Sequence, residues 1–477
     1  MNVKRIHIIL KIISISFACI ILCSCSGKSV RTGMLVATEA PVRIQFHDYI
    51  SDENPRYLPG MRIVAFNPGK PEFLIILTEG FYSACYPDIS CDGRNMLFAA
   101  KQKMDDPWQI WEMDLKHLSL RRITSCKENC IDPVYLPDGR LVFSKSTIND
   151  TVGIAYCLYT CNLDGTGLSQ ITFAPQASYA TRVLKDGRLL MIRRQLLPFK
   201  GKTSFMVMRP DGTKAEIFYS TDDGNVLLSR PYETNDGRIV FIESEKENLP
   251  AGDLISVSYN RPLHSKINLT SEIQYDFKTV LPLGLGKYLV SCRNSNSDSF
   301  GLFEFDPEKE LPGQSFFSDH EYNVLDAIAV GKYERPKKLP SEVDMEVKTG
   351  LLLCQDINFP ETETGSNYTT DRIARKIEVL GVDTSYGIVD VYEDGSFYLK
   401  VMADTPFRIR TLDEKNNVVS GPCSWLWLRP NERRGCIGCH EDPELAPENR
   451  VSFAVKSPPV MIPVHITSVI EKIVQLE

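Results

Sequence analysis

The sequence lacks the short motifs that identify common hydrolases and nucleotide-binding enzymes. It contains no Ser nucleophile elbow, no H-E-x-x-H and no glycine-rich phosphate loop. It also lacks a cluster of basic side chains, and its 54 basic and 61 acidic residues give a net charge of −7. Nucleic acid is therefore not an expected partner. The apolar run from Ile12 to Leu22 is shorter than the roughly 20 residues that a membrane-spanning helix needs.

That short run completes the pattern of an export signal over residues 1–24. Lys4, Arg5 and Lys11 supply the positive charge that precedes it. Leu22-Cys23-Ser24-Cys25 then resembles the cleavage box of bacterial lipoproteins, in which the last cysteine carries lipid. The sequence thus predicts a mature chain of net charge −10, with 51 basic and 61 acidic side chains. Lipid on Cys25 would anchor it on the periplasmic side of a bacterial membrane or at the cell surface; a plain secretory signal or a single anchor helix is the alternative.

A repeat of about 48 residues organises the middle of the chain. Its marker is a Thr or Ser that ends a short β-rich run, at positions Thr78, Thr124, Thr172, Ser220, Thr270 and Ser318. An Asp-Gly-Arg turn follows four of these markers, at Asp92, Asp138, Asp186 and Asp236. Asp-Gly between apolar runs indicates a hairpin, and a repeat of this length built from four short strands is typical of a β-propeller blade.

The ends of the repeat predict six blades over residues 56–335, after a tether at residues 25–55. The sixth copy supplies an inner strand near 324–330, and the strands expected at 62–66 and 73–77 are available to complete it. Closing the ring with strands from both ends leaves no open edge. The pattern resembles the TolB-like six-bladed propellers of the bacterial periplasm.

Beyond a Pro- and Lys-rich linker at 336–340, residues 345–477 predict a small β-sandwich-like domain, so the fold class is all-β. Strands are expected at 350–358, 387–392, 396–401, 407–412 and 424–428. Glu393-Asp394-Gly395 predicts a hairpin between two of them. This domain ends in the most informative motif of the chain.

Cys436-Ile437-Gly438-Cys439-His440 is a C-x-x-C-H run. Two thiols at this spacing can form thioethers with the two vinyl groups of a haem, and the adjacent histidine can bind the iron. In a cytosolic protein the spacing would more often be a redox dithiol or half of a zinc site. The export signal favours one c-type haem, held by Cys436, Cys439 and His440.

A family resemblance agrees with this interpretation. The runs from Val391 to Phe407 and from Trp425 to Glu441 resemble the middle domain of the hydrazine synthase alpha subunit. The resemblance implies a propeller followed by a compact β domain with one c-type haem, in which Cys436 and Cys439 are the thioether links. The chain departs from that family in carrying a single C-x-x-C-H, with no tyrosine after His440.

Several further residues are candidates for the site. His465 and Met461 are the only histidine and methionine after the motif, so either could cap the iron, although surface or packing roles are the alternative. Trp425 and Trp427 are expected to wall off the macrocycle. Arg433 and Arg434 could pair with haem propionates or simply be solvated.

The propeller carries two Cys-x3-Cys pairs and two candidate aspartates. Cys126 with Cys130 and Cys157 with Cys161 lie in adjacent repeats, where disulfides across neighbouring blades are the first expectation and a zinc site the second. Asp88 and Asp132 open inner strands, where turn capping is preferred to metal binding.

Two functions follow from the sequence. The first is an exported, membrane-anchored haem protein that transfers electrons to a redox partner protein or acts on a small nitrogen or oxygen species. The second is a binding or scaffold propeller whose Cys436 and Cys439 form a disulfide or a metal clip without haem.

Overall fold

The computed structural model describes residues 29–43, 57–198, 201–221, 224–245, 251–294, 298–309, 311–313, 315–359, 373–436, 444 and 450–463. Within them, eight β-sheets and one short 3-10 helix, η1 (Phe453–Lys456), make up the regular structure. No helix in this part of the chain is long and apolar enough to cross a membrane. The all-β prediction is confirmed.

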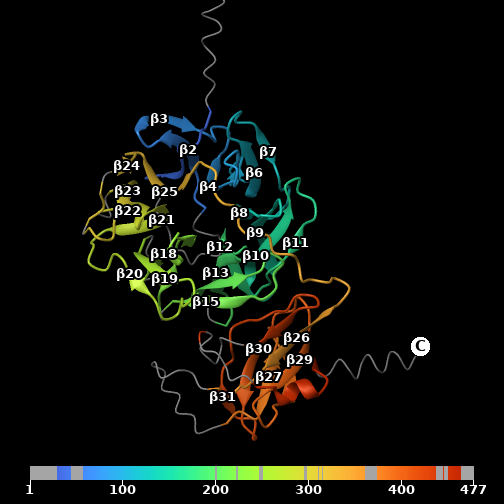
Figure 1. The fold of residues 1–477 in the computed structure, drawn as a ribbon. Helices are drawn as coiled ribbons and strands as arrows, with labels where there is room; N and C mark the ends of the chain where they lie inside the picture. Colours follow the sequence, from blue (N-terminus) through green and yellow to red (C-terminus); the bar gives the residue numbers. More distant parts are fainter. Residues whose placement is uncertain are drawn as a thin grey trace, which may run out of the picture.

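Six of the sheets lie within residues 35–329 of the described chain, and Figure 1 shows them arranged around a common axis. The first contains β4 (Ser83–Ile89), β5 (Asn95–Lys101), β6 (Gln109–Asp114) and β7 (Leu120–Arg122). The second contains β8 (Cys130–Tyr135), β9 (Arg140–Asn149), β10 (Gly153–Asn162) and β11 (Ser169–Gln170). The third contains β12 (Gln176–Val183), β13 (Leu189–Gln195), β14 (Thr203–Met208) and β15 (Glu216–Ser220). The fourth has five strands: β16 (Val226–Leu227), β17 (Tyr232–Glu233), β18 (Arg238–Ser244), β19 (Asp253–Ser258) and β20 (Ile267–Asn268). The fifth has β21 (Asp276–Gly284), β22 (Lys287–Arg293), β23 (Gly301–Phe305) and β24 (Ser315–Phe317).

The sixth sheet joins strands from both ends of this region. It has the order β25 (Tyr322–Ala329), β1 (Leu35–Pro41), β2 (Arg62–Asn67), β3 (Lys70–Ile76). The two outer strands lie where the sequence predicts them. β1 corrects the prediction of a tether at 25–55, because Leu35–Pro41 is a buried strand that pairs with both β2 and β25. Sequence periodicity missed it, since it precedes the first copy of the repeat.

The threonine markers have a defined structural role. Oγ1 of Thr78, Thr124, Thr172 and Thr270 each accepts a hydrogen bond from a backbone N–H of the preceding strand, at 2.8–3.0 Å. All four side chains are buried, and a buried backbone donor must find an acceptor. The repeated Thr therefore satisfies a donor at the point where each outermost strand ends.

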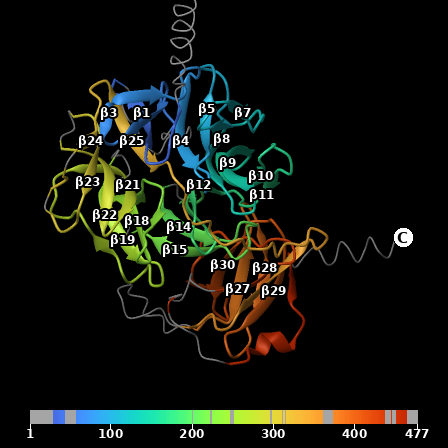
Figure 2. The same cartoon turned by 45° about the horizontal axis from the view of Figure 1, so that its top comes forward.

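The C-terminal domain is a pair of packed sheets. One has the order β32 (Arg433–Gly435), β26 (Thr349–Cys354), β29 (Phe397–Met402), β33 (Val460–Ile462); the other has β28 (Ser385–Asp390), β27 (Lys376–Leu380), β30 (Arg408–Leu412), β31 (Val418–Ser420). Their shared core includes Phe397 and Leu399 from the first sheet and Ile377, Val379 and Ile409 from the second. Figure 2 shows this domain beside the part of the ring that carries β14 and β15.

Two strand predictions for this domain need correction. The Asp394-Gly395 turn forms, but β28 and β29 pair in different sheets, so the turn crosses between layers instead of closing a hairpin. Residues 424–428 form only an isolated bridge, between Leu426 and Phe407. Tertiary packing overrides the local hairpin signal here because each strand buries one face in the shared core.

Candidate functional site

The segment that leads into the C-x-x-C-H motif is fixed by strand pairing. β32 pairs in parallel with β26, and the Cys436 N–H donates to the Leu353 carbonyl at 2.8 Å. Cys436 is buried within the core of the C-terminal domain. The first cysteine of the motif is therefore held on the edge of a sheet, at a defined position.

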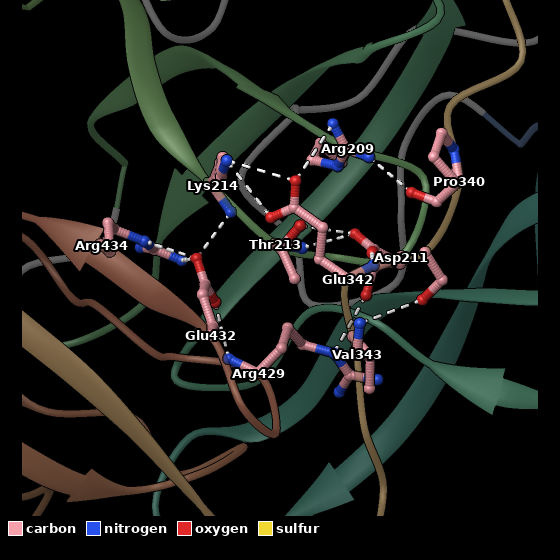
Figure 3. Close-up of polar contacts among 11 residues, drawn as sticks. Arg209, Asp211, Thr213, Lys214, Pro340, Glu342, Val343, Arg429, Glu432 and Arg434 are labelled. Carbon is pink, nitrogen blue, oxygen red and sulfur yellow. Dashed lines mark hydrogen bonds and ion pairs between the residues drawn. The ribbon is translucent and has the colours of Figure 1, made fainter.

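The same segment docks on a turn of the propeller region (Figure 3). Glu432, which is 2% exposed, accepts hydrogen bonds from the Lys214 backbone N–H at 2.6 Å and from the Arg429 backbone N–H at 2.7 Å. Its carboxylate also accepts a hydrogen bond from Nε of Arg434 at 2.9 Å. Glu432 thus connects the two domains through a buried carboxylate, both oxygens of which accept hydrogen bonds.

Arg429 completes the contact from the other side. Its Nε donates to the Asp211 carbonyl at 3.0 Å, and its guanidinium pairs with Asp404 at 2.6 Å. Gly212 lies against it at φ +84°, where an added Cβ would be 2.6 Å from the Ile171 carbonyl oxygen. The turn at 211–214 therefore needs glycine both for its conformation and for the close approach.

Burial and hydrogen bonding act in opposite directions on the two aspartates of this contact. Burial favours a higher pKa for Asp211, but hydrogen bonds led by the Glu342 N–H outweigh it, so the pKa falls below its usual value. Burial raises the pKa of Asp404, and the neighbouring Arg429 only partly opposes that rise.

A cavity of about 330 Å³ lies where the two domains meet. Its walls include Met206 and Ile217 of the propeller region, and Leu352, Trp425, Trp427 and Cys436 of the C-terminal domain. Trp425 donates from Nε1 to the Leu197 carbonyl at 2.8 Å. Trp427 packs among propeller core residues, with its ring centroid 6.1 Å from that of Phe173. The first cysteine of the C-x-x-C-H run therefore lines an aromatic cavity that neither domain forms alone.

The charged lining of this cavity is mostly basic. Within the described chain it comprises Glu216 and four basic side chains: Arg193, Lys214, Arg433 and Arg434. Burial raises the pKa of Glu216, while Arg188 and Arg434 oppose that rise. Arg434 also donates to the Ala215 carbonyl at 3.1 Å, whereas Arg433 is exposed. An excess of basic groups suits a ligand with carboxylates.

Comparison with known proteins gives the relatives of this chain. Residues 357–441 match the family model described as the hydrazine synthase alpha subunit middle domain. Hydrazine synthase subunit alpha of Kuenenia stuttgartiensis is 22% identical over 514 aligned residues, which cover 81% of this chain and 63% of that protein. This chain is a relative of the hydrazine synthase alpha subunit. It spans less than two thirds of the length of that curated relative.

A solved structure shares the fold of this chain. Kuenenia stuttgartiensis hydrazine synthase superposes with a TM-score of 0.76 at 21% identity, over 90% of this chain and 72% of that one. TolB from Acinetobacter baumannii matches 50% of this chain at 17% identity, with a TM-score of 0.32. The shared fold of this hydrazine synthase alpha relative thus covers both the ring of sheets and the C-terminal domain.

Only part of the predicted haem site of this alpha-subunit relative falls within the described residues. Cys436 does, and it lines the cavity with Trp425 and Trp427. Cys439, His440, His465 and Cys25 lie outside the described residues. The sequence singled out the motif but missed Arg193 and Lys214, because no local signal links positions about 220 residues apart.

Met461 lies away from the cavity. It is on β33, at the opposite edge of the sheet from β32, about 14 Å across three strand spacings. It pairs with Lys400, whereas the cavity residue Leu352 pairs with Leu399. Because successive residues of a strand face opposite sides, Met461 lies on the other face of the sheet.

The propeller cysteines correct the disulfide prediction. Cys130 on β8 and both Cys157 and Cys161 on β10 belong to one sheet, with Cys126 just before β8, and all four are free thiols. In the described part of the chain no group of three or more His, Cys, Asp or Glu residues is arranged to hold a metal ion. The prediction was wrong because the repeats and the sheets begin at different points of the chain. The sheet of β8 to β11 lies between the markers Thr124 and Thr172, and so do all four cysteines.

Asp88 and Asp132 do not cap turns, contrary to the sequence prediction. Asp88 pairs with Arg182 at 2.7 Å and accepts the Tyr135 N–H at 2.9 Å. Asp132 pairs with Arg230 at 3.1 Å and accepts the Ala180 N–H at 3.0 Å. Each carboxylate therefore accepts an N–H from the next sheet along the chain and pairs with an arginine of the sheet after that.

Proposed function

We propose that this hydrazine synthase alpha relative is an exported c-type haem protein with a redox role in nitrogen or oxygen chemistry. In this proposal the six sheets are the blades of a six-bladed propeller, and Cys436, Cys439 and His440 hold one haem c. A haem bound there would supply one-electron chemistry at its iron. The observation that carries the proposal is the position of Cys436 in the wall of the cavity between the domains.

The residues around the cavity fit such a group. Trp425 and Trp427 give apolar walls that exclude water from a macrocycle. Arg193, Lys214 and Arg433 line the cavity, and in this proposal they would pair with the propionate carboxylates. Arg429, Glu432 and Arg434 bond to the propeller region, so they would fix the position of Cys436 relative to these side chains. His440 would bind the iron on the proximal side.

His465 and Met461 remain the sequence-predicted candidates for the ligand on the distal side of the haem iron. The position of Met461 on the far face of its sheet favours His465. A second histidine would lower the reduction potential relative to a methionine. Optical spectra of oxidised and reduced protein separate these ligand sets.

Lipid on Cys25 would anchor the protein on the outer side of a bacterial membrane, where c-type haem is attached. The outer surface of the ring would then be available to a redox partner protein. The sequence of residues 1–25 supports the lipid anchor, and the similarity to an enzyme subunit supports a partner protein.

Haem-stained electrophoresis after expression with c-type maturation factors tests the proposal. The wild-type chain is expected to carry covalent haem, and Cys436→Ala with Cys439→Ala to lose it while the propeller stays folded. His440→Ala should keep the stain but shift the Soret band. Cys292→Ala, in the propeller core, is the matched cysteine control and should keep the haem. Wild-type protein without covalent haem would favour the alternative, a binding or scaffold propeller with a disulfide or metal clip at the C-x-x-C.

A further inference from the structure

A second cavity, of about 640 Å³, lies at the centre of the ring of sheets. Each of the six sheets contributes a residue to its wall: Ile89, Val134, Val183, Tyr232, Leu281 and Ile328. Most of its lining residues are apolar or aromatic, and none of them lines the cavity beside Cys436. Ligand sites in proteins typically have volumes of roughly 300–1,000 Å³ and mainly apolar walls. This axial cavity therefore has the size and the lining of a separate ligand site.

The charges that line the axial cavity balance one another. Arg182 pairs with Asp88 at 2.7 Å, and both side chains are largely buried. The Arg182 guanidinium also lies 4.3 Å from the ring centre of Tyr232. Three acidic and three basic side chains make up the other charges of the described lining: Glu233, Asp236, Glu334, Lys185, Lys287 and Arg335. Equal numbers of the two signs suit a ligand of low net charge better than a polyanion such as nucleic acid.

The segment from Tyr333 to Lys337 is a stretch of peptide that already lies on the rim of the axial cavity. The Tyr333 N–H donates to the Cys91 carbonyl at 3.1 Å, and the Tyr333 hydroxyl donates to the Ile89 carbonyl at 3.0 Å. The Lys337 N–H donates to the Lys185 carbonyl at 3.0 Å. Cys91 follows the first sheet and Lys185 lies in the third. The rim therefore binds a peptide backbone through carbonyl groups of different sheets.

Glycine in two of the Asp-Gly-Arg turns permits the close approach of this segment. A Cβ added at Gly93 would lie 2.9 Å from the carbonyl group of Gly331, and one added at Gly187 would lie 2.1 Å from the Lys337 oxygen. The turn at 284–286, in the fifth sheet, differs. A Cβ added at either of its glycines would meet no atom of the described chain within 4 Å. This side of the rim is therefore open.

The open side of the rim presents two leucines. Leu285 is fully exposed and has φ +53°, a left-handed conformation that is unusual for a bulky residue. Leu283 is 43% exposed, and both leucines line the axial cavity. An exposed apolar side chain on a strained turn lowers stability without a gain inside the described chain, which points to a binding role.

We infer that the axial cavity binds an extended peptide segment of a partner protein, independently of the haem site. An apolar or aromatic side chain of that segment enters the cavity. Its backbone passes between the Tyr333–Lys337 segment and the turn at 284–286, so the partner covers Leu283 and Leu285. The apolar lining, the balanced charges and the peptide already seated on the rim together favour this class of ligand.

A phage-displayed library of short random peptides, panned on the full-length protein, supplies the probe. Enriched sequences are expected to share an apolar or aromatic residue, and a fluorescein-labelled synthetic copy then measures affinity by fluorescence anisotropy. The protein with Cys436→Ala and Cys439→Ala should bind this peptide as the wild type does, so loss of haem and loss of peptide binding are separate results. The inference is overturned if no sequence is enriched.

Leu285→Asn distinguishes a binding role from a structural one. Asparagine adopts the left-handed conformation more readily than leucine, so this variant should have a higher urea midpoint than the wild type. It should nevertheless bind the peptide about 10-fold more weakly, because a side chain covered by the partner is lost. Leu283→Asn should weaken binding to a similar degree. Leu311, an exposed leucine between β23 and β24 that does not line the axial cavity, supplies the matched control Leu311→Asn, which should keep wild-type affinity.

Wild-type affinity in both cavity variants would overturn the inference, because the peptide would then bind elsewhere. Weaker binding in either of them, with the control unchanged, supports it. N-acetyl-leucinamide, a single capped residue, is the second probe. If it displaces the labelled peptide as effectively as the unlabelled peptide does, the axial cavity is a site for a small molecule and the inference is again overturned.

Discussion

Replacing Glu432 with alanine should loosen the contact between the propeller region and the C-terminal domain. The carboxylate accepts two backbone N–H groups and one guanidinium N–H, at 2.6, 2.7 and 2.9 Å, and it is almost fully buried. A hydrogen bond to a charged group contributes about 1.5–3 kcal/mol, and breaking a buried ion pair costs about 3–5 kcal/mol. Because these contributions overlap, we expect Glu432→Ala to lower the free energy of unfolding by about 4 kcal/mol.

Part of that loss belongs to the interface itself. The bond from the Lys214 N–H crosses between the domains, whereas the bond from Arg429 stays within the C-terminal segment. We therefore expect about 2 kcal/mol of the effect to appear as weaker docking. Trp425 and Trp427 lie at the junction, so their fluorescence reports its opening. A lower urea midpoint with a red-shifted emission is the expected result.

Glu342 supplies the matched control from the same cluster (Figure 3). Its side chain is 41% exposed and pairs with Lys214 at 3.2 Å and with Arg209 at 3.5 Å. Exposed ion pairs contribute at most about 1 kcal/mol, so Glu342→Ala should change the urea midpoint little. Midpoints are compared because a two-domain chain need not unfold in one step. Equal midpoints for the two variants would refute the reasoning.

Three further predictions follow from the structure. Burial, with a smaller effect of Arg293, lowers the pKa of Lys278 to about 7. The unfolded chain therefore binds more protons than the folded one between pH 7 and about 10.4, and the free energy of unfolding should rise with pH there by up to about 1.4 kcal/mol per pH unit. The urea midpoint should rise less between pH 7 and pH 9 in Lys278→Met than in the wild type, and equal rises would contradict this. Asp132→Asn should lower the thermal midpoint by an amount equivalent to about 3 kcal/mol, because the buried Arg230 loses its counter-charge, while the exposed control Asp105→Asn should stay within about 0.5 kcal/mol in the same scan. Cys25→Ala should accumulate as uncleaved precursor without lipid, measured by intact mass after membrane fractionation; lipid still present in that variant would place the anchor elsewhere.

Local chemistry determined much of the propeller region from the sequence alone. The Asp-Gly turns were predictable because glycine adopts the positive φ they need, as Gly139 and Gly187 do at +90°. The marker threonines were visible as a repeat, and their buried hydrogen bonds explain why that residue type recurs. The outer strands of the closing sheet were predictable because an unpaired edge is unfavourable.

The C-x-x-C-H run was visible in the sequence alone, because two thiols and a histidine at that spacing predict a c-type haem site without a fold. The sequence could not place β1, since a single buried strand before the first repeat carries no periodic signal. It could not show that the turn at 393–395 crosses between sheets, because a hairpin and a crossover have the same local residues. Those outcomes depend on which core each strand faces.

The cavity beside Cys436 was decided only by tertiary structure. Arg193 and Lys214 come from the propeller region, while Trp427 and Arg433 come from more than 200 residues later. Docking of Glu432 on the Lys214 N–H and of Arg429 on the Asp211 carbonyl brings these segments together. Such contacts join backbone groups that any residue could supply, so sequence patterns hold little record of them. The C-x-x-C-H run is visible in the sequence, but the cavity beside Cys436 forms only because the turn at 211–214 packs against the segment at 429–434.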